Sequence, residues 1–228
     1  MGLTDQYRHL DDLPASIPVF PLPQALLLPR TQLPLNIFEP RYLKMVEDAM
    51  AGARIMGMVQ PAAEAGKEPV PNAPAGQPAI APIGCAGRIT SYAETGDGRV
   101  LITLTGIARF QVSAELQTMT PYRQCAVDWT PFEHDLQPGI GADEVARDRL
   151  LDILRRYLDT HDLQADWRAI KFSGNETLVN SLACISPFGA KEKQALLEAK
   201  TLEERNQILI AMTEIALADE GDQDRPLQ

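Results

Sequence analysis

Basic residues are scarce in this sequence of 228 residues. It contains 21 Lys and Arg against 31 Asp and Glu, which gives a net charge of −10 at pH 7. Contacts to nucleic-acid phosphates depend on clustered Lys and Arg, and attraction to anionic membrane surfaces depends on the same charges. The composition therefore argues against a nucleic-acid partner and against a membrane partner.

Long apolar runs are also absent. No run approaches the ~20 residues that a membrane-spanning helix needs, and residues 1–12 lack the apolar core of a secretory signal. The three cysteines, Cys85, Cys125 and Cys184, are odd in number and far apart. We expect them to be reduced and mostly buried, with a cysteine-based site as the less favoured alternative. These features predict a cytoplasmic protein.

The usual sequence signatures of catalysis are missing. The sequence has no Gly-x-x-x-x-Gly-Lys-Ser/Thr phosphate loop and no Gly-x-Ser-x-Gly nucleophile motif. His9, His134 and His161 are scattered, and none has another His or a Cys at metal-ligand spacing. We therefore expect no intrinsic ATPase or peptidase activity, no cofactor and no metal site. A catalytic pair or metal site assembled through space remains the alternative.

Proline, in contrast, is plentiful, and it separates short apolar runs throughout residues 17–40. Because proline fixes φ and lacks a backbone N–H, these runs are restricted to short or edge strands joined by rigid turns. Pro40 suits the first position of a helix. The apolar residues after it are spaced as on one helical face, up to a C-terminal stop at Gly52. Residues 17–52 therefore predict a strand–strand–helix unit.

A β pattern dominates the rest of the first half, in residues 54–59, 80–93, 99–114 and 121–129. Gly96-Asp97-Gly98 predicts a hairpin turn, and Gly106 predicts a bulge or bend. Several short strands with one early helix predict a twisted sheet rolled into a half-open barrel. Residues 61–79 are rich in Pro, Ala and Gly and predict an exposed loop without helix or ladder. This loop is either a variable surface excursion or a partner-binding segment.

Beyond a loop at residues 131–141 the hydrophobic period changes from about 2 to about 3.6 residues. Apparent capping boxes at 173–176 and 201–204, and a helix restart at Ser186-Pro187, predict antiparallel helices joined by short turns. The tail after Ala218 is expected to fray. We therefore expect an α+β fold, with a β-rich subdomain over residues 1–136 and a helical bundle over residues 137–228.

Several strings occur in a characteristic order: Phe20-Pro21-Leu22, Leu33-Pro34-Leu35, Phe38-Glu39-Pro40-Arg41-Tyr42, Asp97-Gly98-Arg99, Gly106-x-x-Arg109-Phe110, Pro121-Tyr122 and Leu178-Val179-Asn180. In this order they resemble the N-terminal substrate-binding domain of ATP-dependent Lon proteases. The resemblance implies a PUA-like barrel followed by helices, and a module that binds polypeptide. Full-length Lon proteases carry ATPase and peptidase domains after this one, and the resemblance does not extend those activities to this chain.

The candidate binding residues are Phe38, Glu39, Arg41, Tyr42 and Met45. Glu39 and Arg41 either recognise a partner's backbone or charge, or Arg41 bonds strand-end carbonyls while Glu39 satisfies helix N–H groups. Phe38 and Tyr42 are alternatively core residues. We expect the site where this turn and the first helix meet the start of the helical half. The flexible side chains of Met45, Met56 and Met58 would suit varied apolar ligands there, although plain core filling is the alternative for each.

Two classes of function remain. The leading one is a non-enzymatic module that binds unfolded polypeptide or a protein partner in proteostasis. The alternative is a hydrolase or peptidase with a site assembled across the two subdomains. A deep pocket with perturbed acid–base groups would favour the enzyme, whereas a shallow apolar groove without such groups would favour the module.

Overall fold

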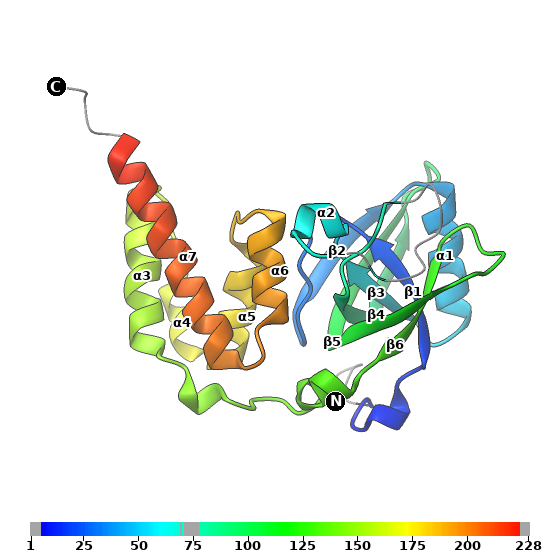
Figure 1. Cartoon of the computed structure of the whole chain (residues 1–228). Helices are drawn as coiled ribbons and strands as arrows, with labels where there is room; N and C mark the ends of the chain where they lie inside the picture. Colours follow the sequence, from blue (N-terminus) through cyan, green and yellow to red (C-terminus); the bar gives the residue numbers. More distant parts are fainter. Residues whose placement is uncertain (1–5, 69, 71–77, 224–228) are drawn as a thin grey trace.

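The computed structural model describes residues 6–68, 70 and 78–223. Its strands are β1 (Ser16–Pro21), β2 (Gln32–Ile37), β3 (Ile55–Val59), β4 (Ile83–Glu94), β5 (Val100–Leu116) and β6 (Arg123–Asp128). Its helices are α1 (Pro40–Ala51), α2 (Ala62–Ala65), α3 (Arg147–Thr160), α4 (Trp167–Phe172), α5 (Asn175–Ile185), α6 (Ala190–Glu198) and α7 (Leu202–Gln223). Three short 3-10 turns are η1 (Leu10–Asp12), η2 (Thr130–Leu136) and η3 (Ala142–Glu144). The strands thus lie in the first half together with α1 and α2, and α3 to α7 make up the second half (Figure 1).

The six strands form one rolled sheet. Pairings β1–β3, β3–β4, β4–β5, β5–β6 and β6–β1 run in a ring. The long strand β5 pairs with β2 through its first part and with β6 through its last part. Within the described residues β2 pairs only with β5, so it stays outside the ring as an edge strand, where Pro34 is tolerated. The predicted α+β fold with a rolled, half-open sheet is confirmed.

Gly106 lies where β5 changes its partner. Its N–H donates to Thr31 O and its carbonyl accepts from Arg30 N, each at 2.9 Å. A Cβ atom at this position would overlap the carbonyl group of Leu28. The register with β4 shifts beside it, between Ala86 and Gly87. The predicted bend at Gly106 is therefore a place where two backbones approach so closely that only glycine fits.

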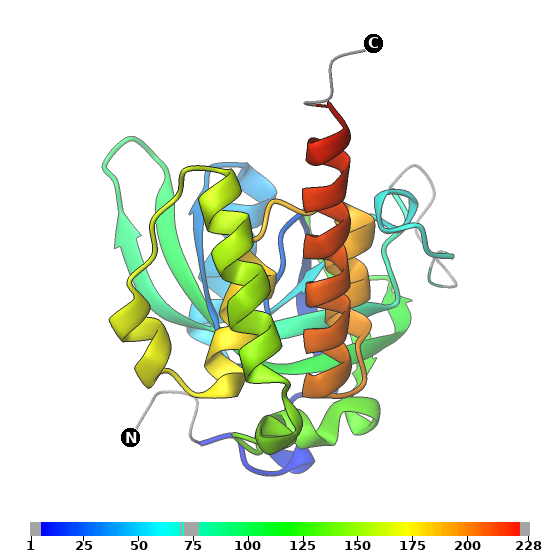
Figure 2. The same cartoon turned by 90° about the vertical axis from the view of Figure 1, so that its left-hand side faces the viewer.

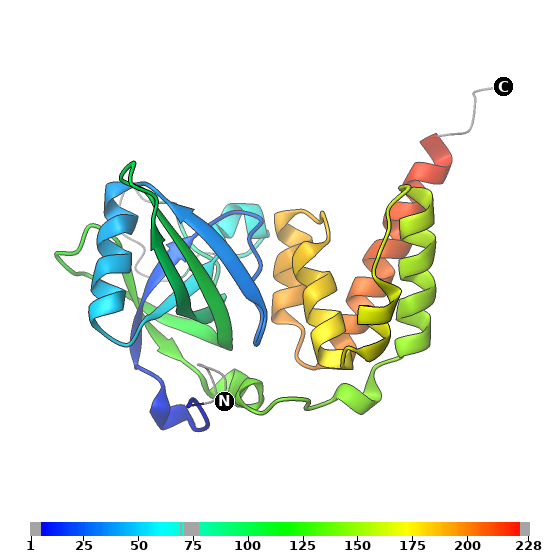
Figure 3. The ribbon, with the colours of Figure 1, turned by 180° about the vertical axis from the view of Figure 1, so that it is seen from behind.

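The helices stack on one side of the sheet. Helices α5 and α6 lie between the rolled sheet and the outer pair α3 and α7 (Figures 1 and 3). Consecutive helices α5, α6 and α7 are antiparallel and joined by short turns, as predicted. Helix α3 differs: it runs in the same direction as α7 and reaches α5 only through α4 (Figure 2). No helix in the described part of the chain is long and apolar enough to cross a membrane.

Hydrophobic packing crosses from one half to the other. One cluster joins sheet residues such as Phe20 and Leu104 to helical residues such as Leu150 and Val179. A second cluster, which includes Phe110, fills the β-rich half. Because both halves contribute to the first cluster, the core does not mark a boundary between them. The division into domains of residues 1–136 and 137–228 therefore stays a prediction.

The segment 61–79 is more ordered than predicted. Residues 69 and 71–77 lie outside the described part, but α2 forms at the start of the segment and Pro61 makes a bridge with Ile80. The segment is anchored because Ala62, Ala65 and Val70 are buried and α2 packs against α6. The prediction of an exposed loop without helix or ladder is wrong for these residues. Likewise α7 continues to Gln223, past the expected fraying point at Ala218.

Two of the predicted helix starts are also wrong. Ser173 donates back to the carbonyls of Ala169 and Ile170, so it closes α4 rather than capping α5. Ser186 similarly donates to Leu182 O at 2.7 Å, and α6 begins only after Gly189. A serine hydroxyl satisfies the end of one helix as readily as the start of the next. At the third site Thr201 accepts from Glu204 N at 3.0 Å, as the capping prediction required.

Candidate functional site

Three of the five predicted binding residues form an exposed group at the start of α1. Phe38 is 60% exposed. The guanidinium of Arg41 donates to Glu39 Oε2 at 2.9 and 2.8 Å, and both side chains are about half exposed. Glu39 makes no side-chain bond to the helix N–H groups. Arg41 and Glu39 therefore bind each other. This differs from the alternative in which Arg41 bonds strand-end carbonyls and Glu39 satisfies helix N–H groups.

The other two predicted residues belong to the core. Tyr42 is 7% exposed and packs against Phe20 with ring centroids 4.2 Å apart. Burial is the main cause that raises the pKa of the Tyr42 hydroxyl. Met45 and Met56 are fully buried, and Met58 is 3% exposed. These four side chains hold the rolled sheet against α1 and do not contribute to a surface, so core filling is the correct interpretation for them.

The expected location of the site is wrong in one respect. Helix α1 lies at the end of the rolled sheet that faces away from the helical half, so the two do not meet (Figures 1 and 3). A hollow of about 650 Å³ does lie beside α1, between this helix and the β4–β5 hairpin, with Leu43, Met50 and Tyr92 among its lining residues. Phe38, Glu39 and Arg41 do not line this hollow. Their role in binding remains a proposal.

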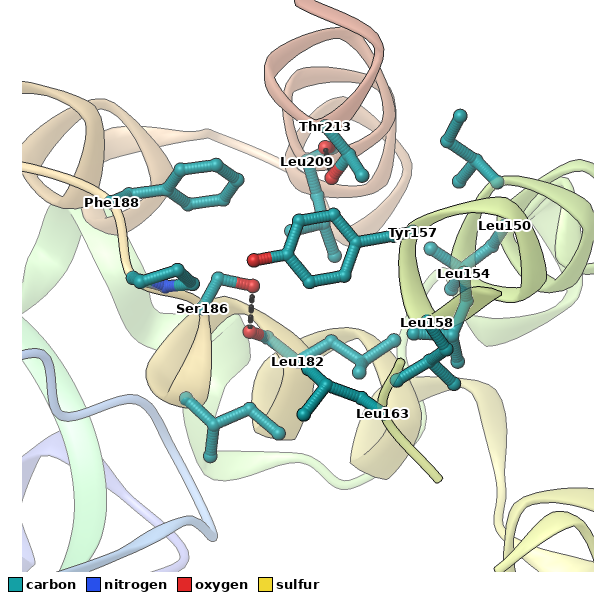
Figure 4. A pocket seen from close by; sticks show the side chains of 13 residues that line it. Leu150, Leu154, Tyr157, Leu158, Leu163, Leu182, Ser186, Phe188, Leu209 and Thr213 are labelled. Atoms are coloured by element: carbon teal, nitrogen blue, oxygen red, sulfur yellow. Dashed lines mark hydrogen bonds between the residues drawn. The ribbon is translucent and has the colours of Figure 1, made fainter. Parts of the chain in front are cut away.

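The helical half contains a groove that the sequence did not predict. It lies between α3, α5 and α7, measures about 330 Å³, and is open to the surface (Figure 4). Its lining consists of Leu150, Ile153, Leu154, Tyr157, Leu158, Leu163, Leu182, Ile185, Ser186, Pro187, Phe188, Leu209 and Thr213. Helices α3 and α5 each pack against α7, and the groove separates the two. No helix of the described chain covers this apolar surface.

The spacing of apolar residues along α3 creates the groove wall. Leu150, Leu154 and Leu158 recur at every fourth position, so they lie on one face of the helix. Leu150 is buried against the core, whereas Leu154 and Leu158 are partly exposed. Leu163, which follows α3, is 52% exposed, and Ile185, the last residue of α5, is 75% exposed at the rim. The face that would ordinarily be covered by another helix is therefore accessible.

The groove is chemically simple. Among its lining residues there is no Asp, Glu, Lys, Arg, His or Cys. The hydroxyls of Ser186 and Thr213 donate to the carbonyls of Leu182 and Leu209 at 2.7 and 2.8 Å, so both are already satisfied. The hydroxyl of Tyr157 points toward the groove interior (Figure 4). Such a surface can bind apolar side chains and offers one polar contact, but it supplies no acid, base or nucleophile.

Titratable residues gather instead at the junction of the two halves. Arg109 from β5 binds both carboxylate oxygens of Asp135 at 2.8 Å and donates to the carbonyls of Leu197 and Ala199 in the helical half. Arg30 pairs with Glu176 of α5. A cleft of about 150 Å³ lies among these groups. Both carboxylates are bound by guanidinium groups. The contacts of Arg109 with α6 and of Arg30 with Glu176 link the β-rich half to the helical half.

Buried Arg205 completes this junction from α7. Its Nη1 donates to Asn180 Oδ1 at 2.8 Å and its Nε donates to Leu196 O at 2.9 Å. Burial is the main cause that lowers the pKa of Arg205 to about 10, and nearby Arg109 lowers it further. Sequence analysis did not find this network because its partners lie far apart along the chain.

The cysteines are free thiols in apolar surroundings. Cys85 and Cys125 are buried, and Cys184 is partly buried. Burial is the main cause that raises the pKa of each thiol, in the case of Cys125 to about 12. No group of three or more His, Cys, Asp or Glu side chains within the described residues is arranged to hold a metal ion.

A rolled sheet followed by stacked helices, with an apolar groove on the helical side, defines an α+β protein with a surface suited to binding. The sequence profile of the ATP-dependent protease La (LON) substrate-binding domain matches residues 16–214. The chain belongs to this family. The resemblance inferred from the sequence strings is therefore confirmed over most of the chain.

Relatives and solved structures agree with this membership. The chain is 26% identical to a Lon protease of Flavobacterium johnsoniae over 205 residues, which are 88% of this chain and 24% of that protein. It is 24% identical to a Lon protease of Dictyoglomus thermophilum over 207 residues, again 24% of that protein. The chain thus spans about a quarter of the length of these relatives.

Two solved structures share the fold. One is a Lon N-terminal domain protein from Xanthomonas campestris, with a TM-score of 0.59 and 23% identity over 86% of this chain and 97% of that one. The other is the N-terminal domain of a Lon protease from the Mycobacterium avium complex, with a TM-score of 0.62 and 16% identity over 87% of this chain and 98% of that one.

Proposed function

We propose that this protein is a non-enzymatic module that binds apolar segments of unfolded or partly unfolded polypeptide in proteostasis, and that the groove between α3, α5 and α7 is its binding surface. Membership of the substrate-binding family supports the general role. The observation that carries the site is an open groove of about 330 Å³ whose walls are apolar. Volumes of about 300–1,000 Å³ are usual for sites that take apolar groups.

The chemistry of the molecule favours binding over hydrolysis. The groove lining contains no acid–base group other than the Tyr157 hydroxyl. At the junction of the halves, Asp135 and Glu176 are engaged by Arg109 and Arg30. Burial keeps the cysteine thiols protonated. These features support the module rather than a peptidase assembled across the two halves, and we expect no turnover of casein or ATP above buffer.

The test is fluorescence anisotropy with a short labelled peptide whose core of Leu, Ile and Phe is flanked by serines. A shallow groove with few deep anchors predicts a Kd on the order of 10 μM. The double variant L163E/I185E places two charges on the groove rim at exposed positions, so the fold should be retained. We expect this variant to weaken binding at least tenfold, roughly 1.4 kcal/mol.

The matched control is F38E/L101E, which introduces the same two charges at exposed apolar positions on the rolled-sheet half. We expect its affinity to stay within about twofold of the parent protein, well under 1.4 kcal/mol. A loss confined to F38E/L101E would move the site to the start of α1. Failure of the parent protein to bind the peptide, or casein turnover abolished by one substitution in this chain, would overturn the proposed function itself.

A further inference from the structure

A buried arginine in the cleft at the junction of the two halves lacks part of its bonding. Arg205 is 3% exposed and belongs to the cleft lining. Its Nε and Nη1 donate to Leu196 O and Asn180 Oδ1, but its Nη2 has no acceptor within the described residues. The ion pairs of the described chain do not include Arg205. A buried charge without a counter-charge and a buried donor without an acceptor are both destabilising, so Arg205 has a need for a further ligand.

The charges that line the cleft leave an excess of one positive charge. The charged lining residues are the cations Arg30, Arg109, Lys200 and Arg205 and the anions Asp135, Glu144 and Glu176. Arg109 binds Asp135 and Arg30 binds Glu176, while Lys200 and Glu144 are both exposed. These six charges cancel, and His134, which also lines the cleft, can only add positive charge. The uncompensated charge is therefore that of Arg205.

The nearest carboxylate does not serve as the counter-ion of Arg205. Both oxygens of Asp135 are bound by Arg109 at 2.8 Å. Burial, together with the nearby positive charge of Arg109, lowers the pKa of Arg205 to about 10, and Asp135 counteracts this only in part. The Arg205 guanidinium thus stays protonated at neutral pH, and its charge must be balanced from outside the described chain.

The cleft offers a way from the surface to these buried groups. Its lining includes the exposed residues Gln137, Ile140 and Lys200 as well as the buried residues Asn180 and Arg205. Its volume of about 150 Å³ is several times what one water molecule requires. A group of a few heavy atoms can therefore enter it.

We propose that this cleft binds a small oxyanion, the carboxylate or phosphate group of a ligand, which supplies the acceptor that Arg205 Nη2 lacks. Hydrogen bonds between a guanidinium and an oxyanion are charge-assisted and are stronger than neutral ones. Arg30 and Arg109 come from the β-rich half and Arg205 from α7, so a bound anion also stabilises the junction. The cleft shares no lining residue with the groove between α3, α5 and α7. This inference is therefore independent of the proposed function.

NMR titration of the 15N-labelled protein tests the site, with the Nε–H signal of Arg205 and the backbone N–H signals of Thr201 and Leu202 as reporters. The ligands are phosphate, acetate and N-acetylglycine, whose carboxylate resembles the end of a polypeptide. Chloride at the same ionic strength and neutral N-acetylglycinamide are the controls. We expect saturable shifts with a Kd on the order of 1 mM for the oxyanions, and none for the controls. Tighter binding of N-acetylglycine than of acetate would identify a polypeptide end as the source of the group, and the reverse would identify a free anion.

Two matched variants test the location. I140E places a carboxylate in the cleft lining at a residue that is 47% exposed, so the fold should be retained. We expect it to weaken oxyanion binding at least fivefold. The control L101E makes the same change at a residue that is 46% exposed on the rolled-sheet half, and its affinity should stay within twofold. R205M should abolish binding; because Arg205 is buried, its fold is checked by circular dichroism, and the comparison of I140E with L101E decides if R205M unfolds.

Absence of saturable shifts with all three oxyanions would overturn the anion site. Equal affinities of I140E and L101E would also overturn it, because binding would then lie elsewhere. Neither result bears on the groove, so the proposed function would stand or fall by its own peptide measurement.

Discussion

The guanidinium of Arg109 reaches three kinds of acceptor at once. It binds the Asp135 carboxylate, lies 4.4 Å over the Phe132 ring, and donates to carbonyls at the end of α6. The Arg109 and Asp135 side chains are only 5% and 10% exposed. Removal of one partner leaves the other buried without its counter-charge, which is more costly than the ion pair is stabilising.

We therefore expect R109M to lower the free energy of unfolding by about 3–5 kcal/mol in urea titrations. The control R149M removes the exposed pair with Glu214, whose side chains are 66% and 43% exposed, and it should change stability by less than about 1 kcal/mol. Equal effects of the two variants would show that the junction around Arg109 is not a principal tie between the halves.

Thiol reactivity tests the burial of the cysteines. Because burial raises the pKa of Cys85, Cys125 and Cys184, the reactive thiolate is scarce in the folded protein at neutral pH. We expect Ellman's reagent to react slowly with the native protein and to titrate all three thiols rapidly in guanidinium chloride. Rapid labelling of Cys85 or Cys125 under native conditions would contradict their placement in the core.

The burial and the long-range partners of individual residues were only partly predictable from the sequence. The sequence reveals the motif around Pro40, but it does not separate exposed Phe38 from buried Tyr42, because one residue lies just before α1 and the other in its first turn, where no hydrophobic period is yet established. The sequence likewise identifies Arg109 in its motif without revealing Asp135, Leu197 and Ala199 as its partners. Those contacts depend on the packing of distant elements, which local patterns do not encode.

Strand β5 approaches the segment before β2 closely at Gly106, and the variant G106A tests this approach. G106A would place a methyl group against the Leu28 carbonyl, and neither backbone can yield without breaking the adjacent pairing. We expect a loss of about 3 kcal/mol or more in thermal or urea unfolding. At Gly174, the N-cap of α5, an added methyl group meets nothing within 4 Å, so G174A should lose only the capping preference for glycine over alanine, about 1 kcal/mol or less. Similar stabilities for the two variants would contradict the close approach at Gly106.

Elements with backbone constraints were predictable, and the groove was not. Helix α1 begins at Pro40 and stops before Gly52, as the proline and glycine required. The leucine stripe of α3 predicts an apolar face but does not say whether another helix covers it. Coverage is decided by the direction of α3 and its long connection through α4, which depend on tertiary packing. The apolar groove is the consequence of that missing cover.

For the whole molecule, the shared hydrophobic cluster and the Arg109 junction predict that both halves unfold together. In W167F, Trp129 remains as the fluorophore of the β-rich half, and circular dichroism at 222 nm follows the helices. We expect the two signals to give one midpoint in urea. Two separate midpoints would instead show that residues 1–136 and 137–228 are independent folding units.

Site-specific photocrosslinking measures most directly where an unfolded polypeptide binds. Benzoylphenylalanine would replace Leu163 or Ile185 at the groove rim, and Phe38 or Tyr92 at the opposite end of the molecule; all four positions are exposed. With the serine-flanked apolar peptide, we expect crosslinks from positions 163 and 185, and competition by excess unlabelled peptide. Crosslinks from positions 38 and 92 alone would contradict binding in the helical groove.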